Sequence, residues 1–298
     1  MRRWPYLHEV LLGLFGGILA LALLVVAGPS APEGWTALAL TVLFLVAVGV
    51  AARHDDAAHA FRLRLLFAYG VTFFLYAFVK QAVPALGLEP RDTLLLAADT
   101  RLFGVTPAAW LQRWSSAWAN ELFSASYLAF HAYLHLAMAQ ALLGPRKRAE
   151  DFFVRVFSAY ALGIAGYFLV PALGPAVASP ELFTAPITGG PFTRLNAAVV
   201  AQGSSAYDVF PSLHTYITLV LLSHDRVHHP RRLRVMVPVA VAIIASTLML
   251  RYHYAVDLLA AFVWFGAFSA SFPRLRDAWD ARWRAPTSRV SLTSDFRG

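Results

Sequence analysis

Long apolar runs separated by short polar turns are the feature that most constrains this chain. Several of these runs approach the roughly 20 residues that a helix needs to cross a hydrocarbon core. Helices satisfy their backbone hydrogen bonds internally, which the lipid interior requires. We therefore predict an all-α, polytopic membrane bundle of about eight transmembrane helices. The runs cover about Leu7–Ala27, Trp35–Ala52, a third segment ending near Val83, Glu121–Leu143, Phe152–Pro171, Pro211–Ser223, Leu233–Leu250 and Tyr254–Phe272.

The composition is typical of a membrane protein. Of the 298 residues, 58% are hydrophobic and only 14% are charged, whereas a soluble domain carries roughly 25% charged residues. The first apolar run is longer than the core of a cleaved signal peptide, so we expect it to be an uncleaved first span. The lack of cysteine excludes disulfide bonds and thiolate chemistry.

The basic residues are distributed unevenly between the two ends of the predicted bundle. If the N-terminus is cytoplasmic, 19 of the 25 Lys and Arg residues lie on the cytoplasmic side. This is the bias expected of an inner-membrane (plasma-membrane) protein with both termini in the cytoplasm. It accounts for the net charge of +8 without a nucleic-acid partner. It also places the starts of the sixth and eighth runs on the extracytoplasmic side.

Two segments are too polar or too broken to be spans. Residues 84–120 contain several Pro and Gly residues, and Trp110, Trp114 and Trp118 recur at helical spacing. This pattern is typical of an aromatic belt at the membrane interface, and a wall facing the substrate is the alternative. Residues 172–209 are expected to form an ordered loop over a site. We treat residues 1–298 as one membrane domain with a polar cytoplasmic tail at 273–298.

Two pentapeptides open the sixth and eighth runs and carry the candidate chemistry: Phe-Pro-Ser-Leu-His at 210–214 and His-Tyr-Ala-Val-Asp at 253–257. His253 and Asp257 are four residues apart, so on a helix they share one face. Asp257 can then accept a proton from one imidazole nitrogen and leave the other nitrogen free to attack. His214 comes from a different helix start. It would act as general acid on the leaving oxygen and then as general base.

The residues around the two motifs could attract an anion. Pro211 suits the first position of a helix. The free N–H groups that follow it, together with the Ser212 hydroxyl, would form an anion-attracting helix N-terminus. Arg251, two residues before His253, can add a fixed positive charge. These features favour a substrate that contains phosphate.

The two pentapeptides resemble the second and third signature motifs of the type 2 phosphatidic acid phosphatase (PAP2) superfamily. The His-Tyr-x-x-Asp form is most similar to the inositolphosphotransferase and sphingomyelin-synthase-like branch. The segments Asp-Thr-Arg-Leu-Phe-Gly at 99–104 and Pro-Ala-Leu-Gly-Pro at 171–175 are also similar to that branch. The resemblance covers about residues 95–272 and implies a six-helix catalytic core.

The resemblance implies lipid phosphoryl transfer through a phosphohistidine, without a metal or other cofactor. His253 would be the nucleophile, Asp257 its orienting partner and His214 the acid and base. The usual first motif, a Lys followed seven residues later by Arg-Pro, is absent, and the usual upstream arginine is replaced by Arg251. The candidates for substrate and phosphate binding are Ser212, Arg251, Arg194, Arg101, Lys80, Tyr127, His131, His135 and Asp208.

Other interpretations of the histidines stay open at this point. His214 and His253 could merely cap helices, or could join Asp257 in a zinc or manganese site. His131 and His135, four apart in the fourth run, could also bind a metal, although lining of a substrate cavity is favoured because intramembrane histidines usually face an interior. A further group in the basic turn after the sixth run is expected to be solvated: His224, His228 and His229.

We therefore predict a membrane enzyme with lipid substrates and an active site at the extracytoplasmic boundary. The first hypothesis is a phosphotransferase that moves a phosphoryl headgroup between a phospholipid and an alcohol. The second is a lipid phosphate or polyprenyl diphosphate phosphatase. A non-catalytic lipid-binding or transport protein is the third, although the internal repeats common in transporters are not evident.

Overall fold

The computed structural model describes residues 5–54 and 57–284, and all regular secondary structure in these ranges is helical. Eight helices are long, as the apolar runs predict. They are α1 (Leu7–Val26), α2 (Pro32–Arg53), α3 (Ala58–Ala85), α6 (Ala117–Leu143), α7 (Arg146–Leu169), α10 (Leu213–His228), α11 (Pro230–Met249) and α12 (Ala255–Trp279). The prediction of an all-α bundle is confirmed.

The shorter elements occupy the two segments that the sequence marks as irregular. The first segment holds α4 (Asp92–Phe103), α5 (Pro107–Leu111) and the 3₁₀ turn Gln112–Trp114. The second holds α8 (Pro175–Ala178), the 3₁₀ turn Pro180–Leu182 and α9 (Pro191–Gly203), so it is more helical than the expected loop. At the other end of the chain, α12 continues past Phe272 and is followed by a π-helical turn at Asp280–Arg284.

Six of the described helices are long and apolar enough to cross a membrane: α1, α2, α3, α7, α11 and α12. The chain is therefore a multi-pass membrane protein. Two of the expected spans do not meet this standard. Helix α10 has only 16 residues, and α6 interrupts its apolar sequence with polar residues such as Asn120, His131 and His135.

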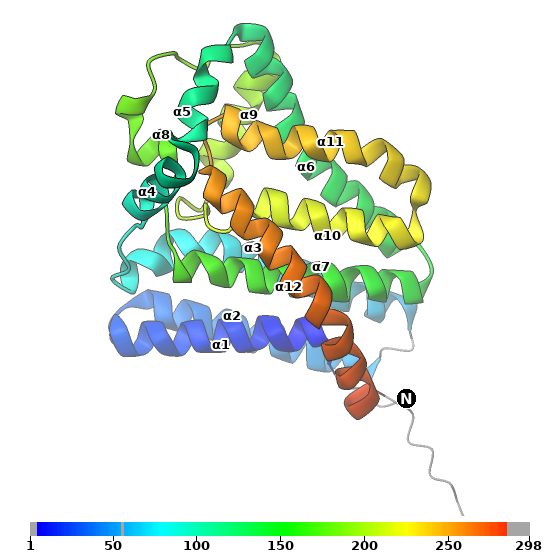
Figure 1. Cartoon of the computed structure of the whole chain (residues 1–298). Coiled ribbons are helices and arrows are strands. Elements are labelled where there is room, and N and C mark those ends of the chain that lie inside the picture. Colours follow the sequence, from blue (N-terminus) through cyan, green and yellow to red (C-terminus); the bar gives the residue numbers. More distant parts are fainter. Residues whose placement is uncertain (1–4, 55–56, 285–298) are drawn as a thin grey trace, which may run out of the picture.

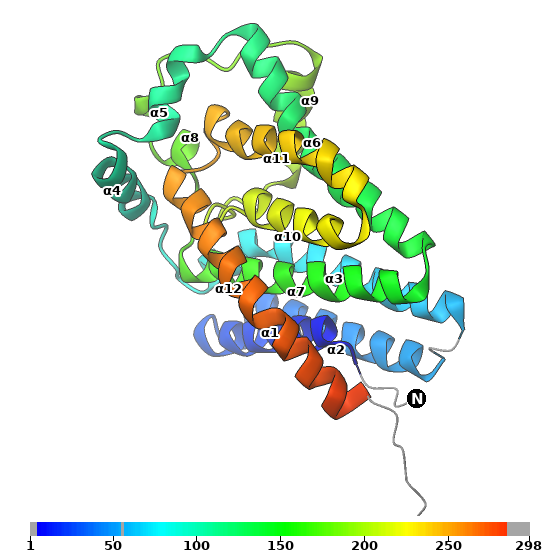
Figure 2. The ribbon, with the colours of Figure 1, turned by 45° about the vertical axis from the view of Figure 1, so that its right-hand side comes forward.

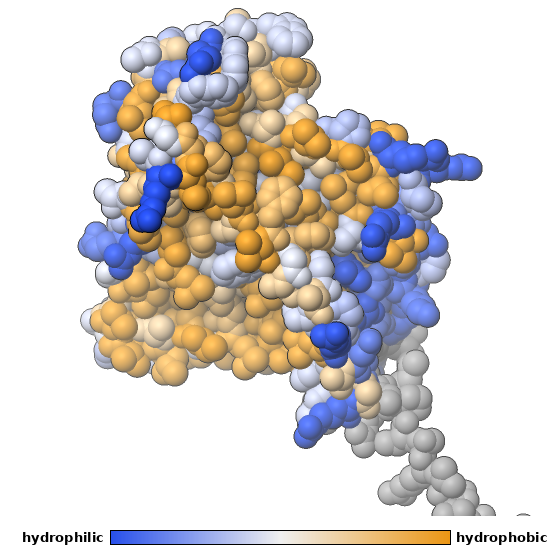
Figure 3. Space-filling model, viewed as in Figure 1, coloured by the Kyte–Doolittle hydropathy of each residue, from blue (hydrophilic) through white to orange (hydrophobic). Residues whose placement is uncertain are grey.

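The surface matches that of a bundle surrounded by lipid. Many large apolar side chains are exposed, including Ile18, Val25 and Leu43 on α1 and α2. In Figure 3 the hydrophobic colour covers the flank of the bundle, while hydrophilic residues gather at its ends. A contiguous apolar surface of this size would be costly in water, but in a bilayer it faces hydrocarbon.

The helices alternate in direction, so their ends gather at two faces of the bundle (Figures 1 and 2). One face carries the short helices α4, α5, α8 and α9, together with the first residues of α10 and α12. The opposite face carries the connections α2–α3, α6–α7 and α10–α11. This arrangement brings the two sequence motifs to the same end of the protein.

At the opposite face, buried ion pairs that the sequence alone does not predict hold the helices together. Arg64 lies in α3 and is fully buried, and both its Nε and Nη2 donate to Glu9 of α1 at 2.6 Å. Bidentate pairs of this kind are strong because the planar guanidinium matches the carboxylate. This ion pair therefore holds α1 against α3.

A second polar cluster joins α7, α10 and α12 at the same face. Asp151 accepts hydrogen bonds from His228 Nε2 at 2.9 Å and from Arg276, and His224 Nδ1 lies 3.4 Å from it. The expectation of a solvated histidine group is wrong for His224, which is buried. The reason is that α10 continues past Ser223 and carries His224 against α7.

Two glycines of α7 allow α10 to pack closely. A Cβ atom at Gly163 would overlap the Leu213 side chain, and one at Gly166 would overlap the ring of Pro211. Small residues permit this close backbone approach between membrane helices. The Phe-Pro-Ser-Leu-His motif is therefore seated directly on α7.

Candidate active site

The first motif forms the start of α10. Ser212 is the N-cap, and its Oγ accepts hydrogen bonds from the Thr215 N–H at 3.4 Å and from the Thr215 hydroxyl at 3.2 Å. Capping of this kind satisfies backbone donors at a helix start. Pro211, preceded by a cis peptide bond, lies before the cap and not at the first helical position. Ser212 is fully buried and does not line the described cavity, so the predicted contact with an anion stays a prediction.

The second motif forms the start of α12. His253 precedes the helix, which begins at Ala255 with Tyr254 as its N-cap, so His253 and Asp257 do not share a helix turn as predicted. They still meet, because His253 Nδ1 lies 3.4 Å from Asp257 Oδ2. Asp257 Oδ2 also accepts the Tyr254 N–H at 2.9 Å. The carboxylate thus caps α12 and faces the imidazole.

A backbone hydrogen bond joins the two motifs directly. The Ser212 N–H donates to the backbone carbonyl of Asp257 at 3.3 Å. Because each N-terminus belongs to a different long helix, this bond fixes the separation between the histidines that the two helices carry. The two motifs are therefore one structural unit, although 38 residues lie between His214 and His253.

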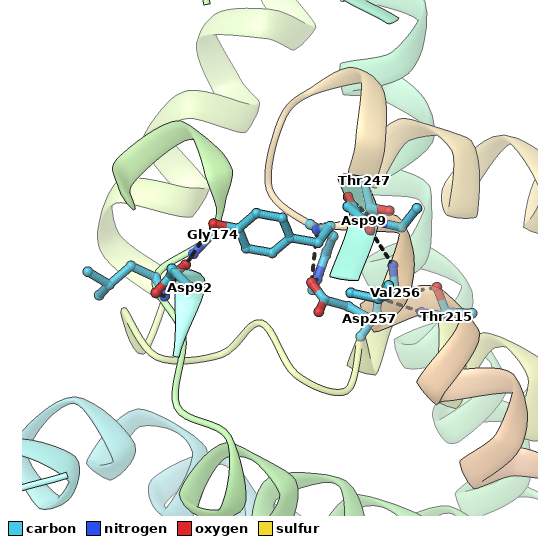
Figure 4. Close-up of polar contacts among 12 residues, drawn as sticks. Asp92, Asp99, Gly174, Thr215, Thr247, Val256 and Asp257 are labelled. Atoms are coloured by element: carbon cyan, nitrogen blue, oxygen red, sulfur yellow. Dashed lines mark hydrogen bonds and ion pairs between the residues drawn. The ribbon is translucent and has the colours of Figure 1, made fainter. Parts of the chain in front are cut away.

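Two buried aspartates of α4 form hydrogen bonds that support the unit (Figure 4). Asp99 accepts the N–H groups of Ala255 at 3.1 Å and Val256 at 2.9 Å. These donors have no partner within α12, since they belong to its first turn. Burial raises the pKa of Asp99, and the two backbone hydrogen bonds oppose that rise. The carboxylate also lies where the helix dipole favours negative charge.

Asp92 joins α4 to two further segments. Its carboxylate accepts the Leu173 N–H at 2.9 Å, the Gly174 N–H at 2.9 Å and the Tyr254 hydroxyl at 3.1 Å. Gly174 has a φ of 87°, and a Cβ there would lie 2.6 Å from the Tyr252 carbonyl oxygen. Only glycine combines that conformation with that approach. Asp92 thus ties the segment 171–175 to the start of α12.

The histidines of the two motifs converge. The ring centroids of His214 and His253 are 6.3 Å apart. His214 Nε2 is buried and has no hydrogen-bond partner among the described residues. The ring of Tyr127 lies 4.3 Å from the ring of His214, and that of Phe130 lies 4.5 Å from it. Both histidines are held in position by packing, yet each presents an edge to the same space.

That space is a cavity of about 430 Å³. Its walls come from α3, α6, α7, α8, α9, the start of α10 and the segment before α12. His214, His253 and Arg251 line it, and the rest of the wall is largely aromatic and aliphatic. A mostly apolar pocket with a few convergent polar groups is the usual form of a small-molecule site.

Arg251 is the basic residue that the structure does bring to the cavity. Its Nη2 donates to the Ala185 carbonyl at 2.5 Å, and its guanidinium lies 4.6 Å from the Phe183 ring centroid. Burial lowers its pKa. Arg251 has a φ of 65°, which costs a non-glycine residue roughly 1–2 kcal/mol. The tight turn before α12 thus keeps a strained arginine beside the nucleophile candidate.

Tyr252 adds a hydroxyl to the same wall. Its oxygen accepts a hydrogen bond from Asn196 Nδ2 of α9 at 2.8 Å. Burial raises the pKa of Tyr252 to about 12, although that hydrogen bond opposes the rise. The hydroxyl therefore keeps its proton near neutral pH and can donate it to a ligand.

The other candidates divide into two groups. Tyr127, His131 and Asp208 line the cavity. His135 does not, because its Nε2 pairs with the Tyr69 hydroxyl at 3.0 Å and its Nδ1 lies 2.7 Å from the His131 carbonyl oxygen. The last three are exposed and do not line the described cavity: Lys80, Arg101 and Arg194.

Sequence reasoning missed the supporting role of Asp92. A usable signal was present, since Asp92 and Asp99 lie seven residues apart in a short helix and therefore share a face. It also missed Tyr252 and Asn196, for which the sequence offers no signal. The hydrogen bond between them depends on where α9 folds back over the cavity.

One group of three side chains in the described chain could hold a metal ion by its spacing, since its ligand atoms lie within 4.8 Å of one another. It consists of Asp151, His224 and His228, at the face opposite the cavity. The group of His214, His253 and Asp257 suggested as a metal alternative does not meet that spacing.

A family model described as the PAP2 superfamily matches residues 93–270, which is more than half of the chain. The match begins within α4 and ends within α12, and it contains both motifs. No curated protein and no solved structure matches the chain.

Proposed function

This chain belongs to the PAP2 superfamily, and on that premise we propose that it is a membrane lipid phosphotransferase that moves a phosphoryl headgroup from a phospholipid to an alcohol. Membership supports a phosphatase or phosphotransferase with lipid-related chemistry in general. The observation that carries the proposal is the pair of histidine rings 6.3 Å apart at one cavity, with a carboxylate 3.4 Å behind one of them.

In the first half of the reaction, His253 Nε2 attacks phosphorus. The bond between phosphorus and the glycerol oxygen of the donor breaks, and His214 gives its proton to that oxygen. Asp257, next to Nδ1, holds the ring and stabilises the positive charge that develops on it. Arg251 and Tyr252 line the same cavity, and in this mechanism the guanidinium and the hydroxyl contact the phosphoryl oxygens.

In the second half, an alcohol takes the place of the departed diacylglycerol. His214 accepts the proton of the alcohol while its oxygen forms a bond to phosphorus and the bond between phosphorus and nitrogen breaks. Water in the same position would give a phosphatase. The wall of the cavity is largely aromatic and aliphatic, and a wall of that kind disfavours attack by water. This supports transfer, as does the His-Tyr-x-x-Asp form of the second motif.

We also propose that the site faces the extracytoplasmic side. The face opposite the cavity carries the α6–α7 and α10–α11 connections, which are rich in arginine and lysine. Positive charge marks the cytoplasmic side of membrane proteins. The N-terminal arginines that add to this bias, Arg2 and Arg3, and the end of the tail at 285–298 lie outside the described residues.

The test is an assay of purified protein with a labelled phospholipid, with and without an alcohol such as inositol or ceramide. We expect a labelled headgroup-bearing product that forms only when the alcohol is present, and loss of that product in His253→Ala. Release of the free headgroup phosphate with every alcohol would show that the enzyme hydrolyses the lipid and does not transfer its headgroup. Equal handling of lipid by His253→Ala and His214→Ala would favour a non-catalytic role.

The same assay tests metal independence. Neither half-reaction assigns a role to a metal, so a chelator added before the substrate should leave the rate unchanged. Loss of activity with the chelator, restored by zinc or manganese, would support the alternative in which the histidines are metal ligands.

A further inference from the structure

One carboxylate stands out in the cavity. Among the residues that line it in the described chain, Asp208 is the only acidic one. It lies in the turn between α9 and α10, six residues before His214. A negative charge here would repel the phosphate that the proposed function requires. A cavity that handles phosphate therefore has no evident use for it, unless the ligand also carries positive charge.

The structure holds this carboxylate firmly in place. Asp208 accepts hydrogen bonds from the Tyr76 hydroxyl of α3, from the Ser204 hydroxyl at 3.1 Å and from the Ser205 N–H at 3.2 Å. Ala206 closes the turn with a φ of 66°, and its N–H donates to Ser204 Oγ at 3.1 Å. A carboxylate has about four acceptor positions, so three donors leave capacity for a ligand.

The hydrogen bond that links the turn at Asp208 to Tyr76 of α3 does not by itself require a charged side chain. An asparagine at this position could also accept from Tyr76, as the amide oxygen is an acceptor. What only a carboxylate adds is an electrostatic effect on the contents of the cavity. The charge, separately from the hydrogen bonds, is thus the feature to be explained.

The surroundings of Asp208 are aromatic. Tyr76, which donates a hydrogen bond to Asp208, has its ring 6.3 Å from that of Tyr167. Both tyrosines line the cavity. A carboxylate beside aromatic faces is a favourable environment for an ammonium group, because ring faces also attract cations.

The positive groups that line the same cavity come from a different segment of the chain. Arg251 and His253 come from the turn before α12, whereas Asp208 and Tyr76 come from the α9–α10 turn and α3. The ring of Tyr127 lies on the side of the histidines, 4.3 Å from that of His214 and 4.9 Å from that of Tyr252. The wall of one cavity therefore carries an acidic group on one segment and basic groups on another.

We propose that Asp208 selects a donor lipid with a zwitterionic headgroup, in which an ammonium group occupies the space next to Asp208 and the phosphate lies against His253 and Arg251. This inference rests on the proposed function and adds its substrate class. Lipids whose headgroup lacks a cation, such as phosphatidylglycerol or phosphatidic acid, place uncompensated negative charge near Asp208. Because the phosphate is common to all of these donors, the discrimination comes from the attraction between the ammonium group and the Asp208 carboxylate. For unit charges ~8 Å apart, with water between them, at an effective dielectric constant of ~20, it is roughly thirtyfold.

The experiment compares four donors with identical acyl chains in the same nonionic micelles: phosphatidylcholine, phosphatidylethanolamine, phosphatidylglycerol and phosphatidic acid. We expect wild-type kcat/KM to be roughly thirtyfold higher for the two zwitterionic lipids. Asp208→Asn keeps the acceptor for Tyr76 and removes the charge, so it should reduce this ratio at least tenfold. Tyr76→Phe removes a hydrogen bond and keeps the charge, so its ratio should stay close to that of the wild type.

Two results would overturn the proposal: a wild-type preference for the anionic lipids, or an unchanged ratio in Asp208→Asn. If that variant does not fold, inhibition of the wild type decides, because phosphocholine should inhibit more strongly than glycerol 3-phosphate and the reverse order would exclude the proposal. Failure of the proposed function looks different, as the wild type would then process none of the four lipids or His253→Ala would match it.

Discussion

Removing Asp99 should loosen the start of α12 and displace the nucleophile candidate without touching the cavity. In Asp99→Ala, the N–H groups of Ala255 and Val256 lose their acceptor. Hydrogen bonds to a charged group contribute about 1.5–3 kcal/mol each. Water replaces part of what is lost, so we expect the first turn of α12 to be destabilised by about 3 kcal/mol, which corresponds to somewhat more than a hundredfold in an opening equilibrium.

The direct assay is hydrogen exchange of the amides in the first turn of α12. If these amides exchange by local opening, the exchange of Ala255 and Val256 should accelerate about a hundredfold in Asp99→Ala. Activity should fall by one to two orders of magnitude, because His253 lies two residues before Ala255 and small misplacements of reacting groups are costly. The effect should appear mainly in kcat, since Asp99 contacts no ligand-facing group.

Thr100→Ala on the same helix is the matched control. The Thr100 hydroxyl is exposed and donates only to the carbonyl of Leu96, so that variant should keep wild-type exchange and activity. Asp99→Asn should fall between the two, because the amide oxygen can accept from one backbone N–H and the amide nitrogen cannot accept from the other. Unchanged protection of Ala255 and Val256 in Asp99→Ala would refute the bracing role.

Three further changes test other parts of the account. Gly166→Ala forces a methyl group against Pro211, so thermal unfolding should show that the folded state is less stable by about 1–3 kcal/mol. The control Gly17→Ala has open space around the new methyl group and should be neutral or stabilising. Arg251→Lys keeps the positive charge but loses the planar guanidinium and its stacking on Phe183. Steady-state kinetics should then show a donor KM about tenfold higher. The control is Arg101→Ala on the surface, which should leave KM unchanged. Asp151→Ala removes the partner of Arg276 and His228, so the free energy of unfolding should fall by on the order of 3 kcal/mol. The donor KM should not change, because Asp151 lies at the face opposite the cavity. A large change in KM would contradict this.

The helical architecture was largely predictable because it follows from one-dimensional patterns. Apolar length predicts spans, and the eight runs correspond to the eight long helices. Helix ends were less predictable. Helix α10 extends past Ser223 because Asp151 of α7 provides a partner for the polar residues of its last turns, and that partner is distant in sequence.

In the candidate site, too, some features could be predicted from the sequence and others could not. The motifs locate His214, His253 and Asp257, because short segments at helix starts carry their chemistry with them. The supporting residues could not be assigned in this way. Ser212 caps α10, and Lys80, Arg101 and Arg194 lie on the surface. Such outcomes depend on which way each side chain faces after the helices pack, and no local pattern encodes that.

The account depends on a covalent bond between His253 and phosphorus. The most direct measurement is therefore rapid acid-free quenching of the purified protein with a donor lipid labelled in its phosphate, followed by mass spectrometry of the peptide that contains residue 253. We expect a phosphoryl-headgroup adduct on His253 in the wild type, its accumulation in His214→Ala when the donor has an activated leaving group that needs no proton, and its absence in His253→Ala. Turnover without any adduct on His253, or an adduct on another residue, would contradict the mechanism.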